Sequence, residues 1–172
     1  MRWKQLSADA ESRSYVLVYA AGDEVVSELE AFARDRGMTA ASFTAVGALR
    51  RAVVGYFDWE AKRYLRIPVE EQVELLSLTG DIALADGGPA VHAHVVLGRR
   101  DATTRGGHLL EATVRPTLEL ILTEAPVHLV KRADPETGLS FIYLTNGLDR
   151  HMVRQARRGV ALSSIAADAA KS

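Results

Sequence analysis

Hydrophobic and polar positions alternate in short runs along most of the chain. Residues 14–19 are rich in β-branched and aromatic side chains, which is typical of a β-strand. Similar runs follow from residue 40 onward, at residues 42–49, 52–59, 63–67, 73–83, 91–97, 109–115, 117–122, 128–131 and 139–144. This series of short, closely spaced runs predicts a sheet of many strands.

One segment has the period of a helix instead. Its apolar positions fall on one helical face and are Val25, Leu29, Phe32 and Ala33. Asp23 is a predicted N-cap, and Gly37 stands where a helix commonly ends. One main helix among so many strands favours an α+β fold, in which the helix packs on a central, mostly antiparallel sheet or barrel.

The length of 172 residues fits one domain. We expect a lead-in at residues 1–12, one α+β domain at residues 13–144, and a tail or terminal helix at residues 145–172. No run reaches the roughly 18 apolar residues of a membrane span, and the chain begins with a polar segment. These features predict a cytoplasmic protein without membrane contact.

Composition and charge narrow the possible chemistry. The chain has no cysteine, so any metal must be held by imidazole and carboxylate groups rather than by thiolates. Its 21 Lys and Arg residues nearly balance 22 Asp and Glu residues, for a formal net charge of −1. This balance gives no general attraction to the phosphates of nucleic acid, so DNA binding would need a local basic patch.

Three of the five histidines form a pattern typical of a metal site. His92 and His94 lie two positions apart, which on a strand places both on one face, about 6.5–7 Å apart. His108 follows two glycines that let the backbone approach its neighbours closely. Three imidazoles leave one coordination position open, so we hypothesise a divalent ion, with zinc as the first choice. His128 and His151 lie outside the pattern and are interpreted as structural or solvated.

Charged residues elsewhere are candidates to assist this site. Glu74 and Glu119 lie inside apolar β-runs, where an unpaired charge is costly, so each is either a general base or fourth ligand or a residue that faces solvent. Arg99, Arg100 and Arg105 are candidates to hold an anion or to contact DNA.

Several motifs occur together in a fixed order. They read ELLSLTG at residues 74–80, GPAVHAHVVL at residues 88–97, GGHL at residues 106–109 and TLE at residues 117–119. This combination resembles the plants and prokaryotes conserved (PPC) domain in its stand-alone bacterial and archaeal form. The resemblance spans roughly residues 13–144.

The resemblance implies an α+β fold related to that of α-acetolactate decarboxylase, and a homotrimer. In that enzyme an HxH pair and a downstream histidine hold a divalent metal, and His92, His94 and His108 match this spacing. The enzyme's other catalytic residues have no matched positions here, so its activity is not carried over. Relatives are commonly described as candidate DNA-binding proteins, but the AT-hook of the plant proteins is absent from this chain.

Three functions are therefore open at the level of sequence. The first is a trimeric metal-binding protein that acts as an enzyme on a small carbonyl or carboxylate compound. The second is a DNA-binding or regulatory protein, whose basic contacts would come from the arginines named above or from those at residues 150–158. The third is an assembly module without catalysis.

Overall fold

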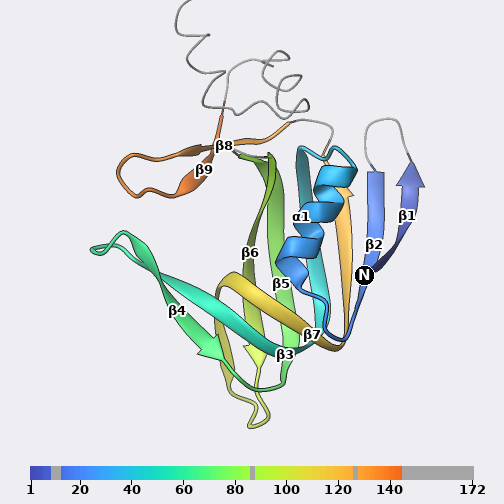
Figure 1. Cartoon of the computed structure of the whole chain (residues 1–172), viewed down its shortest axis with the longest axis vertical. Helices are drawn as coiled ribbons and strands as arrows, with labels where there is room; N and C mark the ends of the chain where they lie inside the picture. The colour runs from blue at the N-terminus through green and yellow to red at the C-terminus, as the bar shows by residue number, and fades with distance from the viewer. Residues whose placement is uncertain (9–12, 86–87, 126–127, 145–172) are drawn as a thin grey trace, which may run out of the picture.

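The computed structural model describes residues 1–8, 13–85, 88–125 and 128–144 (Figure 1). Its elements in chain order are β1 (Arg2–Ala8), β2 (Arg13–Ala20), α1 (Val25–Asp35), β3 (Ala40–Asp58), β4 (Arg63–Val69), β5 (Val73–Ala85), β6 (Gly88–Gly98), β7 (Thr104–Glu124), β8 (Val130–Ala133) and β9 (Ser140–Tyr143). The predicted tail at residues 145–172 lies outside the described residues.

The strands form one sheet with the order β1-β2-β7-β3-β5-β8-β9, while β4 pairs with β3, and β6 pairs with both β5 and β7. All strand pairs are antiparallel except a single parallel bridge between Leu84 of β5 and Val130 of β8. The predicted α+β fold with a mostly antiparallel sheet is therefore confirmed. The barrel alternative is wrong, because the sheet is mixed and, within the described residues, ends at β1 and β9, which each pair with one strand.

Two long strands replace four of the predicted short ones. The predicted run at residues 42–49 and all but the last residue of the run at 52–59 belong to the single strand β3. The runs at residues 109–115 and 117–122 belong to the single strand β7. The residues between the predicted runs do not form turns, because the register of β3 against β7 shifts at several bulges and pairing then resumes. A further strand, β1, forms within the predicted lead-in and pairs with β2.

The helix lies where the sequence predicts it, with its start shifted by one residue. The N-cap is Glu24 rather than Asp23, because the Glu24 carboxylate accepts a hydrogen bond from the Ser27 N–H at 2.8 Å. The same carboxylate accepts from the Ala112 N–H of β7 at 3.0 Å, which ties the helix start to the sheet. Asp23 instead accepts from the Ala20 N–H in the preceding turn.

The helix ends two residues before Gly37, which takes up the left-handed position that the sequence predicts for a helix stop. Gly37 has a φ of +61°, and its N–H donates to the Arg34 carbonyl at 3.1 Å. The Met38 N–H donates to the Ala33 carbonyl at 2.9 Å, which completes a Schellman motif. Glycine suits this position because other residues pay a steric penalty in the left-handed region.

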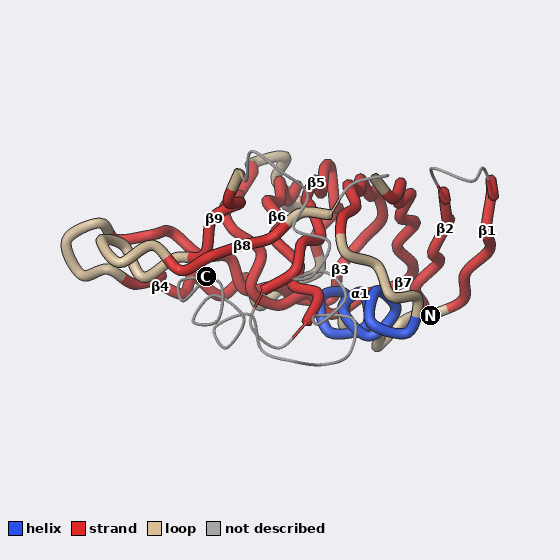
Figure 2. The backbone as a smooth tube through the Cα atoms, turned by 90° about the horizontal axis from the view of Figure 1, so that it is seen from above, coloured by secondary structure: helices blue, strands red, loops and turns tan. Residues whose placement is uncertain are grey.

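The core lies between α1 and one face of the sheet, and Figure 2 shows the helix on one side of the strands. The helix contributes the predicted face, Val25, Leu29, Phe32 and Ala33, all buried. Phe32 packs edge-on against Tyr15 of β2, with ring centroids 5.3 Å apart. Each large apolar side chain buried in this way stabilises the fold by about 1.5–3 kcal/mol.

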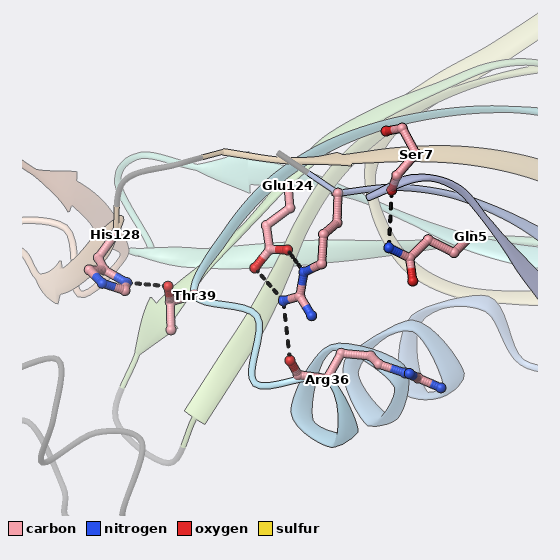
Figure 3. A network of polar contacts seen from close by, with 7 residues as sticks. Gln5, Ser7, Arg36, Thr39, Glu124 and His128 are labelled. Atoms are coloured by element: carbon pink, nitrogen blue, oxygen red, sulfur yellow. Dashed lines mark hydrogen bonds and ion pairs between the residues drawn. The ribbon is translucent and has the colours of Figure 1, made fainter. Parts of the chain in front are cut away.

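Polar contacts join the end of the helix to the strands beside it (Figure 3). Arg13 at the start of β2 donates to the Glu124 carboxylate at the end of β7, at 2.8 Å, and to the Arg36 carbonyl at 3.4 Å. The Thr39 hydroxyl contacts the His128 ring close by.

Among the residues that the structure describes, no helix is long and apolar enough to cross a membrane.

Candidate metal centre

The site begins with the alternation along β6. Ala93 and Val95 are buried in the core that α1 covers, so the residues that alternate with them along the strand point to the opposite face of the sheet. His92 and His94 are those residues, and both are exposed. The predicted strand with one apolar face and one histidine-bearing face is confirmed.

The pairing of β6 with β7 brings in the third histidine. His94 lies directly opposite His108 in this antiparallel pair. The ring centroids of His92, His94 and His108 lie 5.2–5.5 Å apart. One ring nitrogen from each of the three lies within 4.8 Å of the other two. The side chains converge as the sequence predicts.

Glycines allow the strands to approach closely enough for this convergence. A Cβ atom on Gly106 would lie 2.8 Å from the Val95 carbonyl oxygen of β6, and one on Gly107 would lie 2.7 Å from the Gly55 carbonyl oxygen of β3. Real Cβ contacts are essentially never shorter than 3.0 Å. The two glycines are therefore required where β7 passes between β6 and β3, immediately before His108.

The His108 ring is held between two other rings. It stacks on Tyr64 of β4 with a centroid distance of 4.6 Å and an interplanar angle of 23°, and on His92 at 5.2 Å and 30°. His94 meets the other two imidazoles edge-on. Burial raises the pKa of the Tyr64 hydroxyl, so this ring stays uncharged at neutral pH. Tyr64 was not among the predicted site residues, because it lies 44 residues before His108 in the chain and in no shared motif.

The electrostatics of the site favour a neutral His108. Burial of the imidazole, together with the nearby His92, His94 and Lys131, lowers the pKa of His108 to about 4. Its Nδ1 atom is buried without a hydrogen-bond partner among the described residues. A neutral imidazole is the form that binds metals, and a buried nitrogen without a partner is costly unless a ligand occupies it.

A carboxylate and an ammonium group lie beside His92. Asp81 of β5 pairs with His92 across the sheet, and its Oδ2 lies 3.2 Å from the His92 Nδ1. Its Oδ1 lies 2.7 Å from the Nζ of Lys131 in β8. Neither Asp81 nor Lys131 was among the predicted site residues. The position of Asp81 in a run directly before the HxH strand is the one signal that could have indicated it.

The two predicted carboxylates are not part of the histidine group. Glu74 on β5 and Glu119 on β7 are both exposed, so the structure shows the solvent-facing alternative that the sequence left open. Buried and exposed residues alternate around each glutamate as predicted, and the carboxylate lies on the exposed face of the strand. His128 contacts Thr39 away from the group, and His151 lies outside the described residues.

The three predicted arginines lie at the tip of the β6–β7 hairpin. Arg99 forms an ion pair with Glu71 at 2.6 Å, and a longer one with Asp101 at 3.7 Å. Arg100 and Arg105 are exposed. The positive charge at this tip is therefore partly offset by two carboxylates.

Residues 6–126 match the family model of the Plants and Prokaryotes Conserved (PCC) domain. The chain belongs to this family. It is the PPC family that the ordered motifs resemble. No curated protein matches the chain.

Several solved structures have the same PPC fold. A PPC protein from Pyrococcus horikoshii is 30% identical with a TM-score of 0.73, and the match covers 85% of this chain and 97% of that one. A metal-containing protein from Archaeoglobus fulgidus is 31% identical with a TM-score of 0.71, over 84% of this chain and 99% of that one. A candidate DNA-binding protein from Ralstonia eutropha JMP134 is 33% identical with a TM-score of 0.71, over 76% of this chain and 91% of that one.

The expected relation to α-acetolactate decarboxylase holds for the fold. The enzyme from Bacillus subtilis strain 168 is 10% identical with a TM-score of 0.50, over 84% of this chain and 65% of that one. A likeness at this identity shows the shared fold alone.

Proposed function

We propose that this PPC protein binds one divalent metal ion through His92, His94 and His108, and that the ion serves an enzymatic reaction on a small carbonyl or carboxylate compound. The observation that carries the proposal is the convergence of three ring nitrogens within 4.8 Å of one another on an outer face of the sheet.

The donor set fits such an ion. Ligand nitrogens about 2.0–2.1 Å from a tetrahedral ion lie about 3.4 Å from one another, which small ring rotations would reach here. The lowered pKa of His108 keeps its imidazole available, and its Nδ1 lacks a partner among the described residues. The similarity to the metal-containing protein from Archaeoglobus fulgidus also supports a metal, and the all-nitrogen set supports zinc, nickel or iron over magnesium or calcium.

Exposure of the site supports a reaction rather than a purely structural role. A divalent ion with three histidine ligands keeps a free position and can polarise a carbonyl group or lower the pKa of a bound water. The His92 side chain is 46% exposed, so a small molecule can reach the site from solvent. Arg100 and Arg105 are proposed to attract an anionic substrate. Glu74 and Glu119 are given no role in this reaction, because their side chains are not part of the group formed by the three histidines.

Metal analysis of the protein purified without a nickel column tests the proposal. We expect about one zinc, nickel or iron ion per chain. The His94→Ala variant should lose the ion, while His128→Asn, which changes a histidine outside the group, should keep it. Folded wild-type protein that takes up none of these ions, even after incubation with each, would contradict the proposal.

DNA association is a second candidate, favoured by the similarity to the candidate DNA-binding protein from Ralstonia eutropha JMP134. Its contacts would come from Arg100 and Arg105, which are exposed on the β6–β7 hairpin. We also propose that the chain forms a homotrimer, as the family resemblance implies.

A further inference from the structure

The buried Lys131 forms an ion pair with Asp81, which is partly exposed and lies beside His92. The Lys131 side chain is 6% exposed, although lysine is among the residues that are rarely buried without a partner. Its Nζ lies 2.7 Å from Asp81 Oδ1, and the Asp81 side chain is 26% exposed. Lys131 belongs to β8, which joins the rest of the sheet through the single bridge between Leu84 and Val130. The C-terminal hairpin, formed by β8 and β9, thus contributes a charged group to the surroundings of the site.

The two oxygens of Asp81 have separate partners. Oδ1 contacts Lys131, and Oδ2 lies 3.2 Å from His92 Nδ1. A carboxylate can only accept, so a neutral His92 must carry its proton on Nδ1 to make this hydrogen bond. Its Nε2 then has a free lone pair. A carboxylate that accepts from the ring N–H of a metal-binding histidine fixes the tautomer and orientation of that histidine and increases its basicity.

The ammonium group fixes the carboxylate in turn. An exposed aspartate rotates among several rotamers, but an ion pair with a buried lysine holds one of them. The pairing also offsets the cost of the two charges, since a buried charge without a partner is strongly destabilising. The order of contacts is therefore Lys131, Asp81, His92, and it runs from β8 through β5 to β6.

We propose that Asp81 and Lys131 are positioning residues: Asp81 holds His92 in the Nδ1–H tautomer with Nε2 free for the metal, and Lys131 fixes the Asp81 carboxylate. The proposal rests on the three-histidine metal site proposed above. It assigns a role to the C-terminal hairpin, which contributes none of the three histidines.

The first test is on the metal-free protein and needs no activity. Nitrogen-15 NMR at about pH 8, where ordinary imidazoles are neutral, should show His92 mainly as the Nδ1–H tautomer. The Asp81→Ala variant should lose this preference. Since this variant leaves Lys131 buried without a partner and can unfold, the double variant Asp81→Ala with Lys131→Met removes both charges and should stay folded. Asp35→Asn, which changes an exposed acid on α1, is the matched control.

The second test is zinc affinity, measured by competition with a chelator. Asp81→Ala should bind zinc about 10–100-fold more weakly than the wild type. Lys131→Met should show a smaller loss, and adding it to Asp81→Ala should cause no further loss, because the lysine acts through the carboxylate.

Each outcome separates this proposal from that of the metal site itself. Wild-type protein that fails to bind zinc, nickel or iron contradicts the metal site. Wild-type protein that binds zinc, with a double variant that keeps both the His92 tautomer and the wild-type affinity, contradicts the role of Asp81. A Lys131→Met variant that binds zinc as tightly as the wild type, or more tightly, contradicts the role of Lys131.

Discussion

His108 differs from the other two histidines of the site in how its ring is held. His92 and His94 project from an exposed face of β6, whereas His108 is half-buried between the rings of Tyr64 and His92. Stacked rings in this arrangement contribute about 0.5–1.5 kcal/mol beyond the apolar area that they bury. The stack therefore restricts His108 to the orientation in which its imidazole meets the other two.

This arrangement gives a prediction for Tyr64. Replacing Tyr64 by Leu removes the ring that covers His108, so zinc affinity should fall by about 2–10-fold, the equivalent of the stacking energy. Tyr64→Phe keeps the ring and should bind zinc as the wild type does. Tyr56→Leu, at a 66% exposed position on the same hairpin, is the control. Equal affinities for Tyr64→Leu and the wild type would show that the stack does not position His108.

At the scale of elements, the β6–β7 hairpin sets the spacing of the histidines. Its tip is closed by Asp101, whose carboxylate accepts from the Thr103 hydroxyl at 2.6 Å and from the Thr103 N–H at 3.1 Å. The Arg99 N–H donates to the Thr103 carbonyl at 2.9 Å in the same turn. These contacts fix the register that places His94 opposite His108.

The hairpin tip should respond to acid in a defined direction. Hydrogen bonds from the Thr103 hydroxyl and N–H lower the pKa of Asp101 below its ordinary value of 3.8. A carboxyl group whose pKa is lower in the folded state stabilises the fold above the ordinary value, and this contribution is lost as the pH falls through the lowered pKa. An NMR titration should find the Asp101 midpoint below that of an unfolded peptide. The Thr103→Val variant should have a higher Asp101 midpoint, because it loses the hydroxyl that donates to the carboxylate. The Thr104→Val variant should keep the wild-type midpoint.

The elements themselves show how far local sequence determines structure. The helix, its apolar face and its stop before Gly37 depend on residues within a few positions of one another, and these predictions are confirmed. The predicted breaks within β3 and β7 are wrong, because pairing with distant strands continues across the bulges. The strand β1 was not predicted, since its residues form a strand through pairing with β2 rather than through a strong β-pattern of their own.

For the whole molecule, the first prediction concerns its assembly. The family resemblance implies a trimer, and the sheet leaves large apolar side chains exposed on several strands, among them Val46, Leu76, Val96 and Ile121. These residues come from the neighbouring strands β3, β5, β6 and β7, and exposed apolar surface commonly marks a protein interface. Light scattering at micromolar concentration should therefore report three times the mass of one chain. A monomer at that concentration would count against the trimer.

The second whole-molecule prediction concerns DNA. The formal net charge is −1 per chain, so assembly multiplies a slightly negative total, and attraction to DNA must come from local arginines. Arg99 is already paired with two carboxylates. At the tip of the β6–β7 hairpin, Arg100 and Arg105 are therefore the candidates to contact DNA phosphates. We expect weak binding without sequence preference at physiological salt, which weakens further as salt is added.

A salt titration with two unrelated DNA duplexes checks this expectation. Nanomolar affinity near 150 mM salt, with a clear preference for one duplex, would favour the DNA-binding function over the metal-dependent one. An Arg100→Ala and Arg105→Ala double variant that binds DNA as the wild type does would place any contacts elsewhere on the chain.

The sequence by itself determined the α+β class, the helix and the three histidines, because each depends on local spacing. The HxH pair shares a face through the two-residue period of a strand, and His108 is marked by the glycines beside it. Only the tertiary structure decided which other residues join them. Tyr64, Asp81 and Lys131 come from strands β4, β5 and β8, and strand register places them beside the histidines. Register follows from the burial of apolar faces across the whole sheet, which no local pattern specifies.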